Sequence, residues 1–515
     1  MLQIRELTIT HRKDLRTILD RFSCTLNHGD KAVIIGEEGN GKSTLLKWIY
    51  DPALIEGYAD AEGICSCRGE KLAYLPQELP EEDRGLTVYE FFCNYPLFHE
   101  ISPKELVAQT ARFGFDPDFC YSDRIMGTLS GGEKVKTQML RILIEEPTVL
   151  LLDEPSNDLD IAMLEWIEKL ILDFKGIVLF ISHDETLIEN TANMVIHLEQ
   201  LYRKTECRFT VAKLSYKEYA SQRLNALEYQ EQQAKQDIRE KKIRDEKYRK
   251  IAQKVEQAQE NISQSDPHGG RLLKKKMKAV KSLERRFSRE DESMTEMPYA
   301  EEAINFRLGS EENVIPNGKT VLEFGPEDVK IPDSDEILAR NVELVVRGPE
   351  KIGIIGKNGI GKTTLIKEIV SSLEDRHDIR VEYMPQNYTD LLDPDRTPVQ
   401  SICKNGDPEE KKTVRNWLAA LRFTSEEMDR SVRELSGGQK AKIFLLRMNT
   451  FGANVLILDE PTRNFSPLSG PVIRSMLRGF PGAIISVSHD RKYLSEVCTK
   501  VLTFTEDGLE ENDHK

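Results

Sequence analysis

Paired cysteines and long apolar runs are missing from this 515-residue sequence. The eight cysteines are scattered and include no CxxC pair, which argues against a zinc site or a disulfide-stabilised scaffold. No apolar run approaches the roughly 18 to 20 residues needed to cross a bilayer. The first seven residues also lack the charged-then-apolar pattern of a secretion signal. These absences predict a soluble protein of a reducing cytoplasm.

The net charge of the chain is −15, but one segment has the opposite sign. Residues 213–290 hold 21 Lys and Arg against 12 Asp and Glu, a net charge of +9, so the rest of the chain carries −24. The excess is greatest over 271–289, which has nine basic residues and one acidic residue, Glu284. A solvated helical face is the usual explanation of such a run. In an otherwise acidic protein it also indicates a polyanionic partner.

Helical periodicity marks the same segment on both sides of Ser-Asp-Pro-His-Gly-Gly at 265–270. Proline cannot continue a helix and glycine lets the backbone reverse, so a turn is expected there. The pattern predicts an antiparallel helical hairpin. Apolar residues recur three and four positions apart at Tyr248, Ile251, Val255, Ala258 and Ile262 before the turn, and at Leu273, Met277, Val280, Leu283 and Phe287 after it.

Four motifs occur twice in the same order, which predicts two copies of one domain. The aspartate of the third motif and the histidine of the fourth are 30 positions apart in both copies. The lysine of the first motif precedes that aspartate by 111 positions in the first copy and by 97 in the second. The 14 extra residues of the first copy fall mostly before Gln77. The motifs are GEEGNGKS and GKNGIGKT at 36–43 and 356–363, LSGGE and LSGGQ at 129–133 and 435–439, DEP at 153–155 and 459–461, and SHD at 182–184 and 488–490.

The first motif pair has the form of a phosphate-binding P-loop. Each follows a short apolar strand, at 31–36 and 351–355, and each opens a helix. Backbone N–H groups of the loop and of the helix N-terminus would bind phosphates. Lys42 and Lys362 would reach the β- and γ-phosphates, and the hydroxyls that follow them would ligate Mg²⁺.

The third motif pair places acids at the ends of continuous apolar runs, 149–153 and 455–459. Such runs are typical of strands buried on both faces of a parallel sheet. An acid that merely caps the next turn is the alternative explanation. Beside a P-loop, Asp153 and Asp459 suit the Mg²⁺ shell, and Glu154 and Glu460 could polarise the attacking water.

Together these motifs resemble the ATP-binding cassette family. P-loops occur in many NTPases, but the LSGG signatures upstream of the Asp-Glu-Pro strands are typical of cassettes. The resemblance covers about residues 1–210 and 305–515. It implies an α/β fold with tandem nucleotide-binding domains over residues 1–212 and 301–515, joined by the helical-hairpin linker, 213–300. Each ATP would lie between the P-loop of one copy and the signature of the other.

The resemblance also implies a role for each repeated residue, so ATP and Mg²⁺ are the expected cofactors. The catalytic residues would be Glu154, Glu460, His183 and His489, the histidines sensing the γ-phosphate. The first ATP would contact Gly36, Gly39, Gly41, Lys42, Ser43 and Thr44 with Ser436, Gly437 and Gly438 opposite. The second would contact Gly356, Gly359, Gly361, Lys362, Thr363 and Thr364 with Ser130, Gly131 and Gly132 opposite. Mg²⁺ would lie near Ser43, Gln77, Asp153, Thr363, Gln386 and Asp459.

Two cassettes with a long linker resemble ABC-F proteins, whose linker enters the ribosomal exit site and points toward the peptidyl-transferase centre. The implied partners are the 70S ribosome, its 23S rRNA and the P-site tRNA, with no membrane, and pairing of the two cassettes suggests a monomer. RNA would meet the linker tip at His268, Arg271, Lys274, Lys275, Lys276 and Lys278. Only 53 and 50 positions separate the glutamine from the signature serine in the two copies, too few for the extra arm of many translation factors. This favours a likeness to Gram-positive resistance proteins that displace lincosamides, pleuromutilins and streptogramins A.

Two departures from the cassette pattern stand out. Ser466 occupies the D-loop position where the first copy has Asp160, so the two ATP sites should be unequal. No aromatic residue was found where many cassettes stack adenine, which leaves the preference for ATP over GTP open.

Two other functions remain possible at this stage. The chain could be a housekeeping translation factor that acts on tRNA or ribosome state without any drug. It could also be the ATPase subunit of a transporter or DNA-repair complex. A transporter subunit would not need a long basic hairpin to dock on a membrane partner. DNA-repair cassettes carry zinc-binding CxxC pairs and a long coiled coil inserted within the cassette, and this sequence has neither.

Overall fold

The computed structural model describes residues 1–157, 159–201, 205–260, 267–292, 294–295, 297–298, 308–309, 314–331 and 336–511. The chain forms two compact units, Met1–Tyr216 with Glu301–Lys515, and Lys217–Ala300. The first unit contains both copies of the repeated domain, called here the first repeat (1–212) and the second repeat (314–511). The second unit is the helical hairpin. No helix of the described residues is both long and apolar enough to span a membrane.

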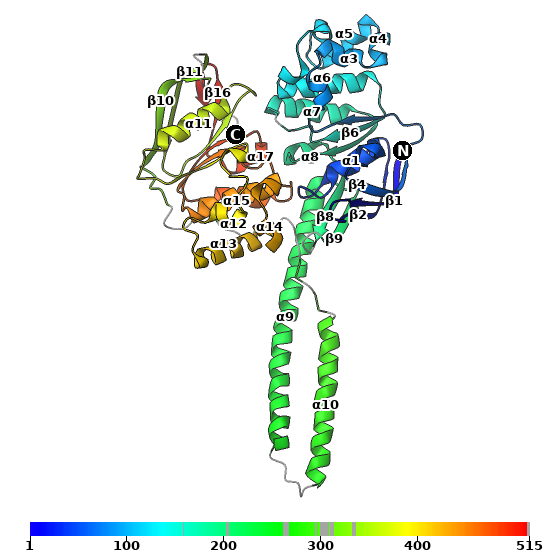
Figure 1. The fold of residues 1–515 in the computed structure, drawn as a ribbon, viewed down its shortest axis with the longest axis vertical. Coiled ribbons are helices and arrows are strands. Elements are labelled where there is room, and N and C mark those ends of the chain that lie inside the picture. Colours follow the sequence, from blue (N-terminus) through cyan, green and yellow to red (C-terminus); the bar gives the residue numbers. More distant parts are fainter. Residues whose placement is uncertain are drawn as a thin grey trace. The chain divides into compact units, whose positions relative to one another are not determined.

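The first repeat is built on a six-stranded sheet in the order β5-β6-β7-β3-β8-β9 (Figure 1). All neighbours are parallel except β8 and β9. Every residue of β3, β6 and β7 is buried, as their unbroken apolar sequences predict. The strands are β1 Leu2–His11, β2 Thr17–Leu26, β3 Lys31–Ile35, β4 Ala59–Ser66, β5 Leu72–Leu75, β6 Val149–Asp153, β7 Ile177–Ile181, β8 Met194–Leu201 and β9 Glu206–Ala212. The helices are α1 Lys42–Tyr50, α2 Glu81–Arg84, α3 Val88–Cys93, α4 Pro96–Glu100, α5 Pro103–Arg112, α6 Gly131–Ile144, α7 Ile161–Asp173 and α8 Glu185–Thr191.

The second repeat has the same sheet, in the order β13-β14-β15-β12-β16-β17. The predicted α/β fold with two cassettes is therefore confirmed. The strands are β10 Thr320–Lys330, β11 Ile337–Arg347, β12 Lys351–Ile355, β13 Val381–Met384, β14 Val455–Asp459, β15 Ala483–Val487, β16 Lys500–Thr505 and β17 Gly508–Glu511. The helices are α11 Lys362–Leu373, α12 Pro398–Ile402, α13 Pro408–Ala420, α14 Ser425–Asp429, α15 Gly437–Thr450, α16 Gly470–Arg478 and α17 Arg491–Glu496.

Most of the extra residues of the first repeat form an additional strand. Between α1 and β5 the chain makes a short 3-10 turn, Pro52–Leu54, and then β4, which pairs antiparallel with β1. In the second repeat the fully described connection 374–380 contains no strand. The small antiparallel sheet is therefore β2-β1-β4 in the first repeat and β10-β11 in the second.

The hairpin unit consists of α9 Tyr216–Glu260 and α10 Pro267–Glu292. They run antiparallel, because partners later in α9 pair with residues earlier in α10 (Figure 1). Lys241 forms an ion pair with Asp291 at 2.9 Å, and the rings of Tyr248 and Phe287 lie edge to face at 6.0 Å. Arg244 lies over the Phe287 ring at 4.8 Å.

Two details of the predicted hairpin were wrong. The turn was placed over 265–270, but residues 267–270 already belong to α10, because proline is well tolerated in the first turn of a helix. Ile251 was placed on the inner stripe, yet it is 44% exposed, and Ala252 occupies the half-buried position beside it. Val255, Met277, Val280, Leu283 and Phe287 are half-buried as predicted; Ile262 and the side chains of Ala258 and Leu273 lie outside the described residues.

A buried charge cluster joins the two repeats beside α8 and α17. Arg474 of α16, only 3% exposed, donates to Glu185 of α8 at 2.7 Å and to Glu496 at 2.9 Å. Lys492 contacts Glu185 at 2.9 Å and Glu189 at 2.6 Å. All the acids of the first repeat in this cluster face basic residues of the second, so the contact has a defined register.

We expect Arg474→Met to destabilise the contact between the repeats. Removing one partner of a buried ion pair costs about 3 kcal/mol, because the other charge stays buried. In this variant Lys492 still contacts Glu185 and neutralises part of its buried charge, which limits the loss. Urea unfolding followed by tryptophan fluorescence should show a lower midpoint for this variant. Arg478→Met, on the exposed face of the same helix, is the control, and equal midpoints for the two variants would contradict the assignment.

Candidate functional site

The P-loop of each repeat joins a buried strand to a helix, as the sequence predicts. Gly41 and Gly361 lie in the left-handed region and cap the N-termini of α1 and α11. At Gly41, φ is 86°, and a Cβ there would lie 2.1 Å from Cγ2 of Ile18. No residue with a side chain fits this position, so the loop keeps its backbone N–H groups turned toward an open cavity.

The first cavity, of about 370 Å³, surrounds the P-loop lysine of the first repeat. The Nζ atom of Lys42 donates to the carbonyl oxygens of Gly36 at 2.8 Å and Glu37 at 3.1 Å. Gly39, Gly41, Ser43, Thr44 and Gln77 line the same cavity, with Asn464 and Arg463 of the second repeat.

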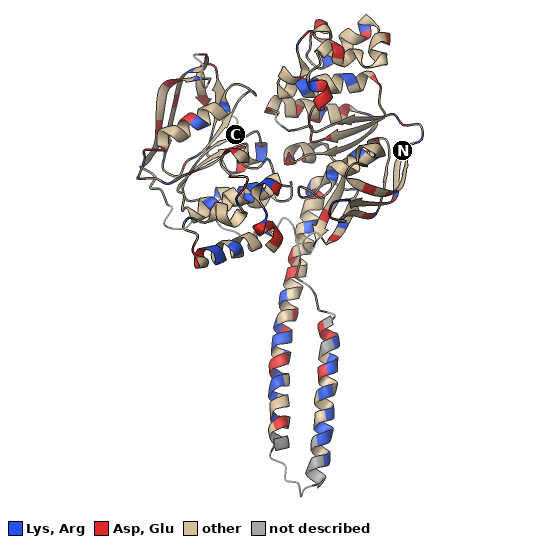
Figure 2. Ribbon diagram, in the orientation of Figure 1, with Lys and Arg blue, Asp and Glu red and all other residues tan. Residues whose placement is uncertain are grey.

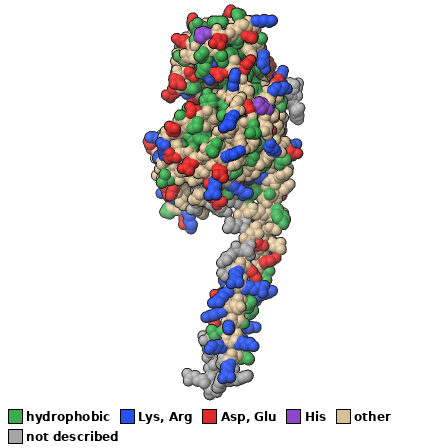
Figure 3. All heavy atoms as spheres, turned by 90° about the vertical axis from the view of Figure 1, so that its right-hand side faces the viewer, with side chains coloured by type: hydrophobic (Ala, Val, Ile, Leu, Met, Phe, Trp, Pro, Cys, Tyr) green, Lys and Arg blue, Asp and Glu red, His purple; other side chains and the backbone are tan. Residues whose placement is uncertain are grey.

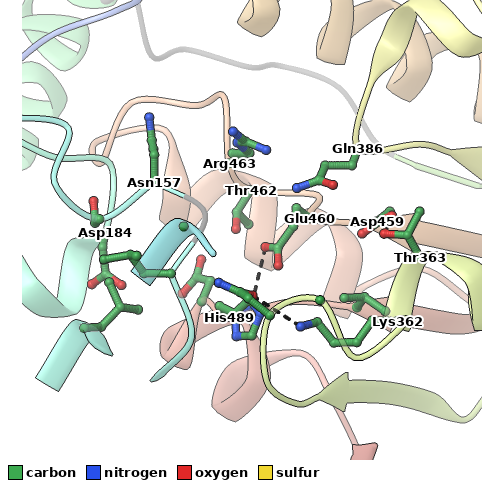
Figure 4. Close-up of a pocket in the computed structure, with 18 of the residues that line it drawn as sticks. Asn157, Asp184, Lys362, Thr363, Gln386, Asp459, Glu460, Thr462, Arg463 and His489 are labelled. Carbon is green, nitrogen blue, oxygen red and sulfur yellow. Dashed lines mark hydrogen bonds between the residues drawn. The ribbon is translucent and has the colours of Figure 1, made fainter. Parts of the chain in front are cut away.

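The second cavity, of about 480 Å³, has the corresponding residues of the second repeat (Figure 4). The Nζ atom of Lys362 donates to the carbonyls of Gly356 and Lys357, both at 2.8 Å. From the opposite side come residues of the first repeat, including Asn157 and the signature glycine Gly131. Gly359, Gly361, Thr363, Thr364 and Gln386 also line it.

The hydroxyl after each P-loop lysine meets the first acid of the Asp-Glu pair. Ser43 donates to Asp153 at 2.9 Å, and Thr363 donates to Asp459 at 2.9 Å. Burial raises the pKa of both aspartates, against the opposing effect of these hydrogen bonds. A hydroxyl and a carboxylate beside a P-loop fit one edge of a Mg²⁺ shell, and the nucleotide and water would supply the remaining oxygens. Among the described residues, no group of three or more His, Cys, Asp or Glu could hold a metal ion.

The second acid of the pair differs between the two sites. Glu154 lies 3.0 Å from Nε2 of His183, whose Nδ1 donates to the carbonyl of Phe465 in the second repeat at 2.7 Å. Burial alone would raise the pKa of Glu154 and lower that of His183. Their mutual attraction outweighs burial, so the pKa of Glu154 is lowered and that of His183 is raised. The contact therefore favours the charged form of both groups.

Glu460 has no such partner among the described residues. Burial, reinforced by the charge of Asp459, raises the pKa of Glu460 to about 8. Burial, reinforced by Lys362, lowers the pKa of His489 to about 4. In the described part of the chain, neither ring nitrogen of His489 has a hydrogen-bond partner, and Figure 4 shows the ring beside Lys362 and Glu460. Buried polar atoms usually have hydrogen-bond partners, so these ring nitrogens beside the P-loop fit a site in which a nucleotide and its bound water would supply them.

The signatures cap the helices that face these cavities. Ser130 and Ser436 are the N-caps of α6 and α15, and each makes a capping box with the residue three positions on. The structure brings the second signature close to the first P-loop, since the backbone N–H of Gly438 donates to Glu38 at 2.7 Å. A Cβ on Gly438 would lie 2.8 Å from the carbonyl oxygen of Asn464 in the same repeat, so the helix end needs glycine to pack against its own D-loop. Gly132 and Gly437 belong to the first turns of the same helices.

Sequence reasoning missed several residues of the cavities. Tyr58 and His11 line the first cavity, so rings do lie beside that P-loop, although none was found from the sequence. His11 is the last residue of β1, and Tyr58 directly precedes β4, so the two rings are far apart in the chain. Arg463 lines both cavities and lies in the D-loop that the sequence analysis singled out only for Ser466. The phenol of Tyr74 donates to Asp153 at 3.1 Å, and its place two residues into β5 was the available signal.

The family model described as ABC transporter matches residues 19–157 and 339–463. The chain therefore belongs to the ATP-binding cassette family and contains two ATP-binding cassettes, a module that implies ATPase activity. ATP-binding protein Uup of Escherichia coli is 27% identical over 95% of this chain and 78% of its own. ABC transporter F family member 5 of Arabidopsis thaliana is 24% identical over 96% of this chain and 74% of its own. The chain resembles these relatives, one of which is named as an ABC transporter F family member, over both of its cassettes and about three quarters of their length.

The solved structures support the fold. The archaeal ribosome recycling factor aABCE1, in its complex with the ribosomal stalk protein aP1, superposes with a TM-score of 0.58. It covers 98% of this chain and 89% of its own, at 18% sequence identity. At that identity the likeness concerns the fold of the paired cassettes alone.

Removing the hydroxyls that meet the aspartates should reduce Mg²⁺-dependent binding of ATP. We expect Ser43→Ala and Thr363→Ala together to weaken binding about tenfold in the presence of Mg²⁺ and to leave binding in EDTA nearly unchanged. Isothermal titration with a non-hydrolysable ATP analogue measures both. Thr44→Ala with Thr364→Ala, one position further along each helix, is the matched comparison. An equal loss in EDTA would show that the two hydroxyls act on the nucleotide and not through the metal ion.

Proposed function

We propose that this protein is a ribosome-associated ATPase whose closed, ATP-bound form binds the ribosomal exit site, and whose hydrolysis of ATP releases it. The observation that supports this most directly is the exposed basic face of α10. Lys274, Lys275, Lys276 and Lys278 are all exposed. Figure 2 shows Lys and Arg recurring along α10, and Figure 3 shows basic side chains gathered on the hairpin. The side chain of His268 lies outside the described residues, and Arg271 is exposed.

The arrangement of charge on the hairpin favours a nucleic-acid partner over a merely solvated helix. The half-buried residues of α10 form one stripe, and the basic residues occupy the other faces. Three arginines, Arg285, Arg286 and Arg289, line a further hollow on the same helix. A helix with many exposed cations suits the phosphates of rRNA and tRNA, which attract basic side chains whatever the base sequence.

In this proposal ATP acts as a conformational ligand. The residues around each cavity come from both repeats, so a nucleotide bound there favours the paired state by contacting both. Lys42 and Lys362 would hold the phosphates. Glu154 would take the proton of the attacking water at the first site, and Glu460 would polarise the water at the second. Mg²⁺ would neutralise the developing phosphate charge at Ser43 with Asp153 and at Thr363 with Asp459.

The double variant Glu154→Gln, Glu460→Gln should accumulate on 70S ribosomes in the presence of ATP. Glutamine keeps the shape of the site but cannot accept the proton, so release by hydrolysis is lost. Sedimentation through sucrose measures binding, and a double variant that stays at the top of the gradient would contradict the proposal. In that background, Lys275→Gln with Lys276→Gln should weaken binding and reduce its dependence on salt. Lys411→Gln with Lys412→Gln, an adjacent exposed pair on α13, serves as the matched control.

A narrower proposal is that the hairpin tip reaches toward the peptidyl-transferase centre and displaces antibiotics of the lincosamide, pleuromutilin and streptogramin A types. It is supported by the resemblance of the hairpin and of the short connection between Gln77 and Ser130 to resistance proteins. The alternative is a translation factor that acts on tRNA or ribosome state, which the likeness to Uup-type proteins accommodates equally.

Expression in a drug-sensitive Gram-positive host separates these two functions. We expect the wild-type chain to raise the inhibitory concentrations of lincomycin, tiamulin and a streptogramin A several-fold, and the double Gln variant to give no protection. Parallel measurements with chloramphenicol and erythromycin test whether protection extends to other drug classes. If the wild-type chain raises tolerance to none of these drugs, and the double Gln variant still arrests growth and accumulates on ribosomes, the protein is a translation factor.

A further inference from the structure

The first P-loop carries two acids where the second has a base and an amide. Its sequence is Gly-Glu-Glu-Gly at 36–39, and the second reads Gly-Lys-Asn-Gly at 356–359. Acids inside a phosphate-binding loop oppose its ligand, because phosphate and carboxylate repel each other. Their contacts in the structure show that both acids are directed to the other repeat.

Glu37 contacts the D-loop of the second repeat, where the usual aspartate is absent. Its Oε1 accepts hydrogen bonds from the hydroxyls of Ser466 and Ser469, each at 2.9 Å. The two serines are 3% and 1% exposed and also lie 3.1 Å from each other. The serine at position 466 is therefore matched to the acid of the opposite P-loop: an aspartate there would place two carboxylates against each other.

Glu38 contacts the signature helix of the second repeat. Its Oε2 accepts the backbone N–H of Gly438 at 2.7 Å and would lie 3.2 Å from a Cβ on Gly437. These residues form the first turn of α15, a helix of 14 residues, whose positive end favours an anion. In the cassette arrangement that the sequence motifs imply, this N–H would face the γ-phosphate of the first ATP.

The second site has the opposite arrangement of charge. There the acid belongs to the D-loop: burial lowers the pKa of Lys362, and the charges of Glu460 and Asp160 partly oppose this shift. The second P-loop has Lys357 and Asn358 at the positions of Glu37 and Glu38. Only the first site therefore has P-loop carboxylates beside its own nucleotide.

We propose that Glu37 and Glu38 form a nucleotide-independent clasp, in which Glu37 takes the place of the D-loop acid and Glu38 that of the γ-phosphate at the second signature. The first site is then held together without ATP and binds it weakly, because an incoming γ-phosphate must displace Glu38. The second site is the one whose closure depends on ATP. The inference rests on ATP binding by the cassettes and not on the proposed ribosomal role, so its tests contain no ribosomes.

A reciprocal exchange at equivalent loop positions tests the role of Glu38. Glu38→Asn copies the second P-loop and should strengthen nucleotide binding at the first site by on the order of tenfold. Asn358→Glu copies the first P-loop and should weaken binding at the second site to a similar degree. A non-hydrolysable azido analogue of ATP labels the full-length protein, trypsin cleaves it in the hairpin, and an amino-terminal tag identifies the first-repeat fragment. Unchanged labelling of that fragment in Glu38→Asn would overturn the proposal.

A double-mutant cycle tests Glu37 without any nucleotide. Ser466→Asp should lower the midpoint of thermal unfolding, because its carboxylate meets that of Glu37. Adding Glu37→Gln to Ser466→Asp should recover most of the loss, although Glu37→Gln alone removes a charge-assisted hydrogen bond and is itself less stable than wild type. If the two losses simply add, Glu37 and Ser466 do not interact and the clasp is disproved.

Discussion

The paired state of this protein depends on the contact that each P-loop makes with the opposite repeat. The lysine, hydroxyl and glycines of one repeat form only part of a nucleotide site. Asn157 and Gly131 complete the second cavity, and Asn464 and Arg463 complete the first. A ligand that touches both repeats can shift their pairing by no more than its difference in affinity for the paired and separated states. The effect of a nucleotide on the pairing of the repeats follows from this shared construction.

Two near-identical motifs have different electrostatics in the two repeats. Burial raises the pKa of a carboxyl at either strand end, but contact with His183 outweighs burial at Glu154, whose pKa is lowered, whereas the pKa of Glu460 is raised to about 8. Nδ1 of His183 donates to the carbonyl of Phe465 in the opposite repeat, while the ring nitrogens of His489 have no hydrogen-bond partner among the described residues. A local sequence motif therefore specifies which groups are present, and the tertiary contacts of the histidines decide their electrostatics.

The charge cluster around Arg474 has a complementary role. It joins α16 and α17 to α8 through buried ion pairs that involve no P-loop residue. Such pairs contribute little net stability but penalise any misaligned pairing, because each charge would then be buried alone. The register of the two repeats can thus be maintained while the P-loop contacts change with the nucleotide.

The sequence alone determined the two α/β repeats, the ends of the Asp-Glu strands and the helical hairpin, because these follow from local periodicity, glycine geometry and motifs repeated at equal spacing. Its errors were also local: residues 267–270 were assigned to a turn, and Ile251 was assigned to the inner stripe instead of Ala252. Only the tertiary structure decided that Tyr58 and His11 lie beside the first P-loop, and that Glu37 and Glu38 meet Ser466, Ser469 and Gly438. These partners are hundreds of residues apart or come from separate strands, and no periodicity along the chain encodes which side chains meet when two folded repeats pack against each other.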